Sequence, residues 1–412
     1  MKPRLRRVPP ACVFLPMILA CAQAAATDTP GAYLDLRYRH EQVDQDGFDR
    51  DASADTLRVR GGYRSGAWNG WSVLAEADAV LALASEHYND TRNGARQYPV
   101  VADPAGAEIN QALLRHAGTR HSASFGRQRI NLGNQRFVGG VGWRQNEQTY
   151  DGVRLQASPW KPLQLDYAWI GGINTVFGPG DSVASNRANP SDISGDSHLL
   201  QATWTPGPAL SASAYHYRLD LEDIAVAATA PLGTLSSRTS GLRLAGKHGD
   251  FSYAAEYARQ REPDGNPWRL DSRYALAELG YALGDVSFKA GWESLGGSDG
   301  PGNRAFQTPL ATKHAFQGWA DVFLTTPAGG VDDRYAGVTV PLAGGSLQAW
   351  YHDFAPERGG GSYGDEIDLS WGRAIPGVQG LTGLAKLARY RSDDRSRTVD
   401  TDKLWLQLQY AY

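Results

Sequence analysis

The feature that most constrains this chain is a period of two residues in its apolar side chains, repeated along almost the whole sequence. Apolar residues alternate with polar or small ones in segments of roughly ten residues, the length that a tilted membrane strand requires. Clear examples are 32–39, 56–63, 71–78, 163–169, 251–257 and 286–293. This period belongs to β-strands with one apolar and one polar face, whereas an amphipathic helix repeats every 3.6 residues. The sequence therefore predicts an all-β protein made of many strands.

The joints between these segments favour an antiparallel barrel in a membrane over a soluble sandwich or propeller. They alternate between tight ones, such as 118–120 and 284–285, and long ones, such as 84–108, 174–196 and 296–313. Outer-membrane barrels show this asymmetry because their periplasmic turns are short and their extracellular loops are long. Aromatic residues near the segment ends, among 12 Trp and 19 Tyr, fit the belts at the two membrane interfaces. No segment after residue 26 approaches the ~20 apolar residues of a membrane helix.

The number of strands depends on the residues around 296–332. A simple count of alternating segments gives 19, but a barrel with both chain ends in the periplasm needs an even number. The joint at 343–345 is short, so we expect it on the periplasmic side, and the joint at 356–364 is long, so we expect it on the extracellular side. Counting the strands back from these joints places 314–330 inside one extracellular loop rather than in a spanning strand. We therefore expect a transmembrane antiparallel β-barrel of 18 strands, with 16 strands as the alternative.

The same loop is unusually apolar for a segment in water, because it contains Phe316, Trp319 and Phe323 together with Asp321. We expect residues 316–323 to fold back over or into the mouth of the barrel, where Phe316, Trp319 and Asp321 would form a constriction. An ordinary hairpin strand in a barrel of different count is the alternative, with 314–323 hydrogen-bonded along the wall.

The N-terminus predicts export from the cytoplasm. Four basic residues precede an apolar stretch from Ala11 to Ala20, and Ala22-Gln23-Ala24 has the small-x-small pattern of a signal-peptidase site. We expect a cleaved signal peptide at 1–24 and the barrel at 25–412. Lipid attachment at Cys21 is the alternative. Both cysteines of the chain lie in this leader, which excludes cysteine catalysis and cysteine metal sites from the mature protein.

The last segment alternates Leu404, Leu406, Leu408, Tyr410 and Tyr412 with mainly polar residues. A final strand that ends in an aromatic residue resembles the signal read by the outer-membrane assembly machinery. We therefore expect Tyr412 to take part in that recognition.

The most specific motif lies in residues 126–155. It comprises Gly126-Arg127-Gln128 at a strand end, Gln135-Arg136-Phe137-Val138-Gly139 and Gly142-Trp143-Arg144-Gln145-Asn146 in a loop, and Thr149-Tyr150-Asp151-Gly152 at the start of the next strand. This segment resembles the alginate-export family of outer-membrane barrels, and 314–321 and 351–354 also look like family features. The resemblance implies an 18-stranded porin whose basic pore passes an anionic polysaccharide.

Five arginines lie at the strand ends and in the loop of this motif: Arg127, Arg129, Arg136, Arg144 and Arg154. Guanidinium groups stay charged and bind carboxylates in a bidentate manner, so we expect a pore-lining ladder that attracts polyuronates or other organic anions. The alternative is a structural lattice in which arginines pair with carboxylates of neighbouring strands. Asp151 is expected to orient an arginine rather than to bind the solute.

Other signals are weak. The nine histidines are scattered and none lies in a recognisable nucleophile motif, so we expect no enzymatic activity. Asp44, Asp46 and Asp49 resemble part of a calcium loop without its distal glutamate. We expect a solvated acidic turn there, with loop-bound Ca²⁺ as the alternative, and no other cofactor. The net charge of −3 gives no indication of a nucleic-acid partner.

The sequence thus predicts a passive channel for anionic saccharides in the cell outer membrane of a Gram-negative bacterium. A general or nutrient-uptake porin without a polysaccharide role is the main alternative; an outer-membrane enzyme and a barrel with a blocked lumen are less favoured. The expected partners are outer-membrane lipid and lipopolysaccharide, the assembly machinery, the saccharide solute and periplasmic export proteins.

Overall fold

The computed structural model describes residues 29–84, 87–179 and 187–412. The signal peptide expected at 1–24 and the alternative lipid site at Cys21 lie outside these residues. Among the described residues, no helix is long and apolar enough to cross a membrane.

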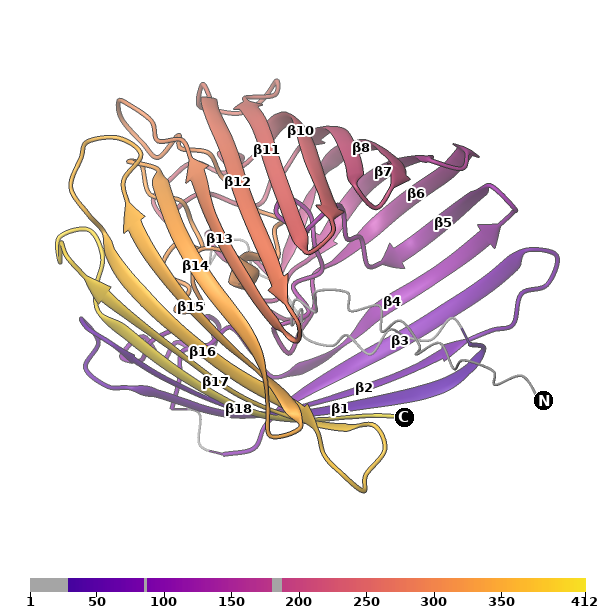
Figure 1. Ribbon diagram of the computed structural model, residues 1–412, viewed down its shortest axis with the longest axis horizontal. Coiled ribbons are helices and arrows are strands. Elements are labelled where there is room, and N and C mark those ends of the chain that lie inside the picture. Colours follow the sequence, from indigo (N-terminus) through magenta and orange to yellow (C-terminus); the bar gives the residue numbers. More distant parts are fainter. Residues whose placement is uncertain (1–28, 85–86, 180–186) are drawn as a thin grey trace, which may run out of the picture.

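The chain forms one closed sheet of 18 antiparallel strands, in which each strand pairs with its neighbours in the sequence and the last pairs with the first. Figure 1 shows these strands as a tilted wall around an interior into which loop segments reach. The strands are β1 (Gly31–Gln45), β2 (Ala52–Arg64), β3 (Trp71–Ala82), β4 (Gly106–Ala117), β5 (His121–Gln128), β6 (Thr149–Trp160), β7 (Leu163–Asn174), β8 (Asp192–Gly207), β9 (Leu210–Leu219), β10 (Ser237–His248), β11 (Phe251–Arg261), β12 (Asp271–Leu283), β13 (Val286–Leu295), β14 (Val331–Leu342), β15 (Gly345–Ala355), β16 (Gly364–Ala374), β17 (Leu381–Ser392) and β18 (Thr401–Ala411). The prediction of 18 strands is confirmed.

The period of two sorts side chains between the outside and the inside of the barrel. On β18, Leu406 and Leu408 are 46% and 48% exposed, whereas Lys403, Trp405 and Gln407 between or beside them are buried. An apolar outside and a polar inside suit a barrel surrounded by lipid rather than a soluble sandwich, whose apolar side chains face inwards.

The barrel closes through β1 and β18. Their backbone register runs from Asp35 opposite Ala411 to Gln45 opposite Thr401. The amide of Tyr412 donates a further hydrogen bond to the carbonyl of Leu34 at 2.9 Å, while its side chain is 82% exposed. Recognition of Tyr412 by the assembly machinery stays a prediction.

Short and long joints alternate around the whole barrel, as expected for periplasmic turns and extracellular loops. The short joints include 118–120, 208–209 and 284–285, and the chain ends lie on their side of the barrel. Residues 296–330 form one long loop whose only regular element is the short 3₁₀ helix η1 (Lys313–Ala315). The inference that 314–330 is not a spanning strand is therefore confirmed.

The turn between β14 and β15 contains one unfavourable residue. Ala343 and Gly344 both have positive φ angles, 49° and 73°, as a two-residue type I′ hairpin turn requires. A positive φ angle strains the backbone of alanine, whereas asparagine adopts such an angle at a lower energetic cost. We expect Ala343→Asn to raise the free energy of unfolding by roughly 0.5–1 kcal/mol, measured by urea unfolding in detergent micelles. A lower value would show that Ala343 makes a contact that outweighs its backbone strain.

Candidate functional site

Two long loops enter the barrel and pair with each other there. They are the β5–β6 loop, residues 129–148, and the β13–β14 loop, residues 296–330. Val138 and Leu310 form an isolated parallel bridge. The amide of Gly139 donates to the carbonyl of Leu310 at 2.9 Å, and the amide of Thr312 donates to the carbonyl of Gln135 at 3.0 Å. The two loops therefore form a single body inside the lumen.

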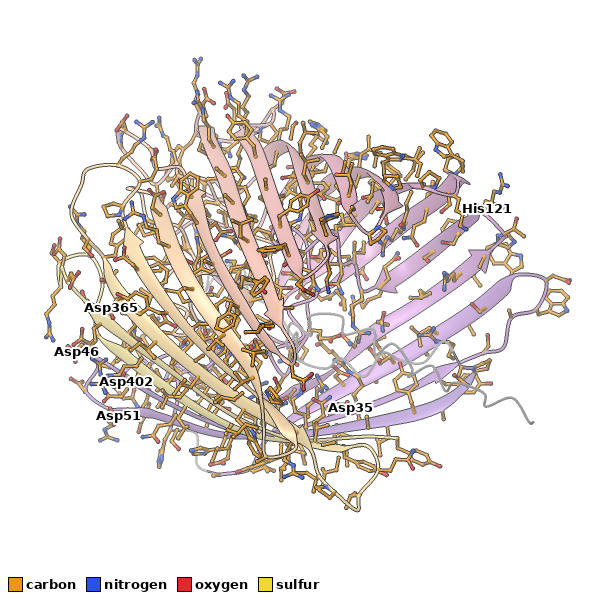
Figure 2. The ribbon with its side chains drawn as sticks, in the orientation of Figure 1. Asp35, Asp46, Asp51, His121, Asp365 and Asp402 are labelled. Carbon is orange, nitrogen blue, oxygen red and sulfur yellow. The ribbon has the colours of Figure 1, made fainter. Side chains whose placement is uncertain are left out.

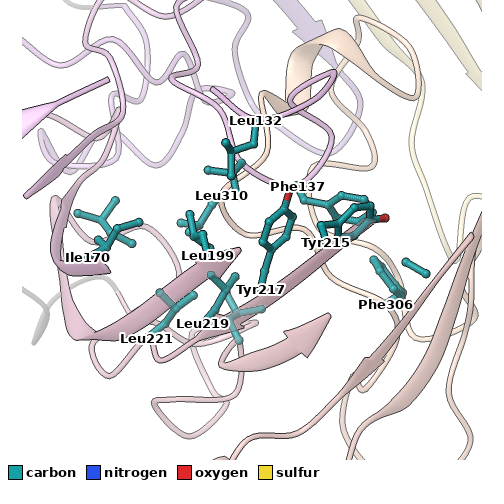
Figure 3. Close-up of a cluster of buried hydrophobic side chains, with 14 of the residues drawn as sticks. Leu132, Phe137, Ile170, Leu199, Tyr215, Tyr217, Leu219, Leu221, Phe306 and Leu310 are labelled. Carbon is teal, nitrogen blue, oxygen red and sulfur yellow. The ribbon is translucent and has the colours of Figure 1, made fainter. Parts of the chain in front are cut away.

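An apolar cluster fixes this body to the inner face of β9–β12. The ring of Phe137 lies 5.4 Å from that of Tyr215 and 5.2 Å from that of Tyr274, and Phe306 of the other loop is 5.9 Å away, measured between centroids. Figure 3 shows Phe137, Phe306 and Leu310 from the loops beside Tyr215, Tyr217 and Leu219 of the wall. Burial of these rings makes this attachment mainly hydrophobic.

Aromatic and cationic side chains attach the loops to the opposite wall. Trp143 stacks on His314, with 4.4 Å between ring centroids, and meets the edge of Trp405 on β18 at 5.7 Å. The ammonium group of Lys386 on β17 lies 4.3 Å from the Trp143 ring and 3.7 Å from the Trp319 ring. Such cation–π contacts strengthen when they are shielded from water.

Asp321 is the ionic centre of this attachment. Its carboxylate accepts from Lys403 at 2.9 Å and from Arg144 at 3.3 Å, and it contacts Nδ1 of His314 at 2.8 Å. Burial alone would raise the pKa of Asp321, but the cations and the ring around it hold that pKa well below its ordinary value. Burial also lowers the pKa of His314 to about 3, so the ring is neutral at pH 7.

Gly318 allows the loop to approach β16. Its φ of +77° lies in the left-handed region, and a Cβ built on it would lie 2.3 Å from an oxygen of Glu366. The neighbouring amides of Ala320 and Trp319 donate to Glu366 at 2.7 Å and to Asp368 at 3.2 Å. Only glycine combines this backbone conformation with such a close contact.

The three residues expected in a constriction all lie in this loop body. Asp321 and Trp319 contact the β16–β18 side of the wall as described above. Phe316 lies under the guanidinium of Arg136, which is 4.8 Å from its ring centroid. Their role as a constriction is taken up below as part of the proposed function.

The five arginines of the motif are all paired with carboxylates. Arg136 and Arg144 are buried in the loop body, whereas Arg129 and Arg154 are partly exposed. The pairs are Arg127–Asp151, Arg129–Glu76 and Arg129–Glu147, Arg136–Glu293, Arg144–Glu41 and Arg144–Asp321, and Arg154–Asp166. The arginines therefore form an ion-pair lattice, in which carboxylates compensate the positive charge of each guanidinium group.

Arg127 differs from the expectation of a luminal ladder. It shares a strand face with Phe125, which is 43% exposed on the outside of the barrel. Its guanidinium binds Asp151 at 2.8 Å through two parallel hydrogen bonds. Asp151 thus orients an arginine, and this pair lies away from the lumen.

The sequence reasoning missed Glu147 and Arg243. Glu147 is fully buried, accepts from Arg129 and from Asn110, and lies 3.1 Å from Arg60. Arg243 on β10 donates to Glu256 on β11 at 2.7 Å. Both could have been found, because Glu147 is a carboxylate within the arginine-rich motif and Arg243 is the cation between the outward Leu242 and Leu244.

A cavity of about 450 Å³ remains between the tip of the β5–β6 loop and the inner face of β6–β10. Amide and hydroxyl groups dominate its lining, among them Asn131, Asn134, Gln164, Gln201, Thr203 and Ser213. Arg154 and Arg243 are the cations in the lining. Each is 18% exposed, whereas the partner carboxylates of Asp166 and Glu256 are 8% and 2% exposed. Asp166 also belongs to the lining, whereas Glu256 does not, so the cavity presents the guanidinium of Arg243 and both ends of the Arg154–Asp166 pair.

Among the described residues, no group of three or more His, Cys, Asp or Glu side chains could hold a metal ion, and loop-bound Ca²⁺ stays an untested alternative. In the acidic turn expected to be solvated, Asp46 pairs with Arg395 at 3.0 Å.

A closed 18-stranded antiparallel barrel with an apolar outside and loops folded into its lumen defines an outer-membrane porin. Solved structures of this class resemble it over nearly their whole length. OpdL of Pseudomonas aeruginosa is 17% identical, with a TM-score of 0.66 over 93% of this chain and 98% of its own. OccAB3 of Acinetobacter baumannii is 14% identical, with a TM-score of 0.69 over 93% of this chain and 98% of its own.

The chain belongs to the alginate export family, whose sequence profile matches residues 34–303. The sequence has no match among curated proteins. The family resemblance and the porin fold expected from the sequence are thus confirmed.

Proposed function

We propose that this porin passes small hydroxylated anions, with uronate saccharides as the solute class, by passive diffusion through the cavity beside the β5–β6 loop. The observation that carries the proposal is the composition of this cavity, in which amides and hydroxyls surround two guanidinium groups. Amides and hydroxyls can replace the hydrogen bonds that a sugar makes with water, and guanidinium groups bind carboxylates.

The cations suit transit rather than tight binding. Arg154 and Arg243 bind carboxylates at 2.6 Å and 2.7 Å, and that of Asp166 also lines the cavity, so a passing anion meets a compensated charge. A permeation site must attract a solute without holding it. Two such sites in one cavity would favour anions while still releasing them.

The loop body supports short solutes over a polymer. It is attached to both walls of the barrel, by the Phe137 cluster on one side and by Asp321 on the other. The cavity of about 450 Å³ is in the range of about 300–1,000 Å³ typical of small-molecule sites. We therefore propose that Phe316, Trp319 and Asp321 belong to a constriction that admits a saccharide unit or a short oligosaccharide. The structure of OpdK of Pseudomonas aeruginosa with vanillate also supports a carboxylate as solute.

The test is single-channel conductance in a planar bilayer, with the reversal potential under a salt gradient and block by glucuronate. Replacing Arg154 and Arg243 together by glutamine should remove anion preference. Glucuronate should then block with an affinity about tenfold lower, since a hydrogen bond to a charged group contributes about 1.5 kcal/mol. Arg127→Gln is the control and should change neither quantity, because Arg127 lies on the outer face of β5.

A general porin is the second candidate, and the pairing of every motif arginine with a carboxylate favours it. In that case the wild type should conduct with little ion selectivity, and the double variant should behave like it. We further propose that the protein has no enzymatic activity, so purified protein should not hydrolyse phospholipid. Uronate export with periplasmic partners and uronate uptake both fit a passive channel.

A further inference from the structure

The outer surface of the barrel carries a row of arginines at the extracellular ends of β9–β12. The row consists of Arg218, Arg238, Arg259, Arg261 and Arg273, all on outward-facing positions. Figure 2 shows nitrogen-tipped side chains projecting from this end of β11 and β12. We call this row the arginine patch.

Neighbours in the arginine patch carry like charges. In the strand register, Arg238 stands directly opposite Arg218 on one side and Arg261 on the other. Arg259 likewise stands opposite Arg273. Like charges directly opposite each other destabilise a sheet, so an anion placed between them would stabilise the arrangement.

Acidic residues near the arginine patch compensate part of its charge. Asp271 binds Arg259 through two hydrogen bonds at 2.6 Å, and Asp196 lies 3.7 Å from Arg218. The carboxylate of Glu262 accepts a hydrogen bond from the amide of Leu270, and Arg238 donates to the backbone carbonyl of Glu262 rather than to its carboxylate. Within the described part of the chain, Arg261 and Arg273 form no ion pair within 4.0 Å, although Asp271 stands opposite Arg261 in the strand register. The patch therefore keeps an excess of positive charge.

Along the strands, the arginine patch lies directly beyond the apolar band that faces the lipid. Along β12 the outward side chains are apolar from Leu283 through Leu279 to Ala275, and the next outward residue is Arg273. On β11, Tyr257 is the last outward apolar residue before Arg259, and it is 52% exposed. An aromatic residue followed by arginine marks the boundary between hydrocarbon and headgroups.

We propose that the arginine patch binds the phosphate groups of the outer-leaflet glycolipid, lipid A. Several arginines at the headgroup level of an anionic leaflet recognise lipid phosphates, and the guanidinium fork matches phosphate oxygens. A phosphate between Arg238 and Arg261, and another between Arg259 and Arg273, would turn both like-charge contacts into bridges. The acidic side chains of Asp46, Asp51, Asp365 and Asp402 lie at the same ends of the barrel but on the β1, β2 and β16–β18 part of its wall, away from this patch (Figure 2).

The test measures binding of bis-phosphorylated lipid A to the purified, folded porin in detergent by native mass spectrometry. Replacing Arg238, Arg261 and Arg273 together by glutamine should weaken binding on the order of tenfold or more. The control variant replaces Arg358, Arg395 and Arg397, which are exposed in loops elsewhere, by glutamine. It loses the same charge and should bind lipid A as the wild type does.

Three outcomes would overturn the proposal. Equal weakening in both variants would show a general effect of charge, and unchanged binding in the patch variant would place lipid A elsewhere. Inorganic phosphate that displaces lipid A at millimolar concentration would show that the patch takes a free anion rather than a lipid. Heat-modifiable migration on gels and unchanged conductance confirm that both variants are folded.

Discussion

Replacing Asp321 by alanine should raise the single-channel conductance and lower the stability of the barrel. Asp321 is buried and connects the β13–β14 loop to Lys403 on β18 and to Arg144 of the β5–β6 loop. Removing one partner of a buried ion pair leaves the other charges without compensation, at a cost of about 3–5 kcal/mol. On that wall the loop body then keeps its aromatic contacts, the Arg144–Glu41 ion pair and the hydrogen bonds of its amides to Glu366 and Asp368. Because the ionic link to β18 is lost, the lumen should widen there.

Single-channel recording and urea unfolding in micelles check this expectation. Asp299→Ala is the matched control, because Asp299 lies in the same loop and pairs with Arg358 but is 84% exposed. Exposed ion pairs contribute about 0–1 kcal/mol, so this variant should keep the conductance and stability of the wild type. Unchanged conductance in Asp321→Ala would show that the remaining contacts hold the loop body in place and that Asp321 is no part of a constriction.

The wall of the barrel could be predicted from the sequence because its signals are local. Alternation decides which side chains of a strand face lipid, and joint length decides on which side a turn lies. The alternation rule holds for Leu406 and Leu408, which are exposed on the outside of β18, and the joint-length rule holds for the two-residue joint at 284–285. The requirement for an even number of strands also excluded a spanning strand at 314–330, where the residue composition alone would have allowed one.

The partners of charged residues that are distant in the sequence could not be predicted, because they come together only through the closed barrel. Arg136 and Glu293 are 157 positions apart, and Lys403 and Asp321 are 82 positions apart. Arg127 shows a different kind of failure. The alternation through Gly126 already placed it with the outward Phe125, but its place in the motif suggested a luminal role. Motif membership therefore predicts the family better than it predicts the direction of one side chain.

Replacing Glu147 by glutamine should destabilise the barrel and change its response to acid. Glu147 is fully buried at the base of the β5–β6 loop, where Arg60 lies 3.1 Å away and Arg129 donates to it. Without this carboxylate the two guanidinium groups keep Glu76 and Asp78. We expect a loss of about 3 kcal/mol, at the lower end for a broken buried pair.

The pH dependence separates this charge effect from a packing effect. Burial would raise the pKa of Glu147, but Arg129 and Arg60 hold that pKa well below its ordinary value. A carboxylate with a lowered pKa in the folded state stabilises the fold above its unfolded pKa of about 4.3 and loses this effect as the pH falls further. Thermal unfolding should therefore show that the difference between wild type and Glu147→Gln is constant from pH 8 to 5 and shrinks below pH 4. A difference that stays constant down to pH 3 would assign the role of Glu147 to shape rather than charge.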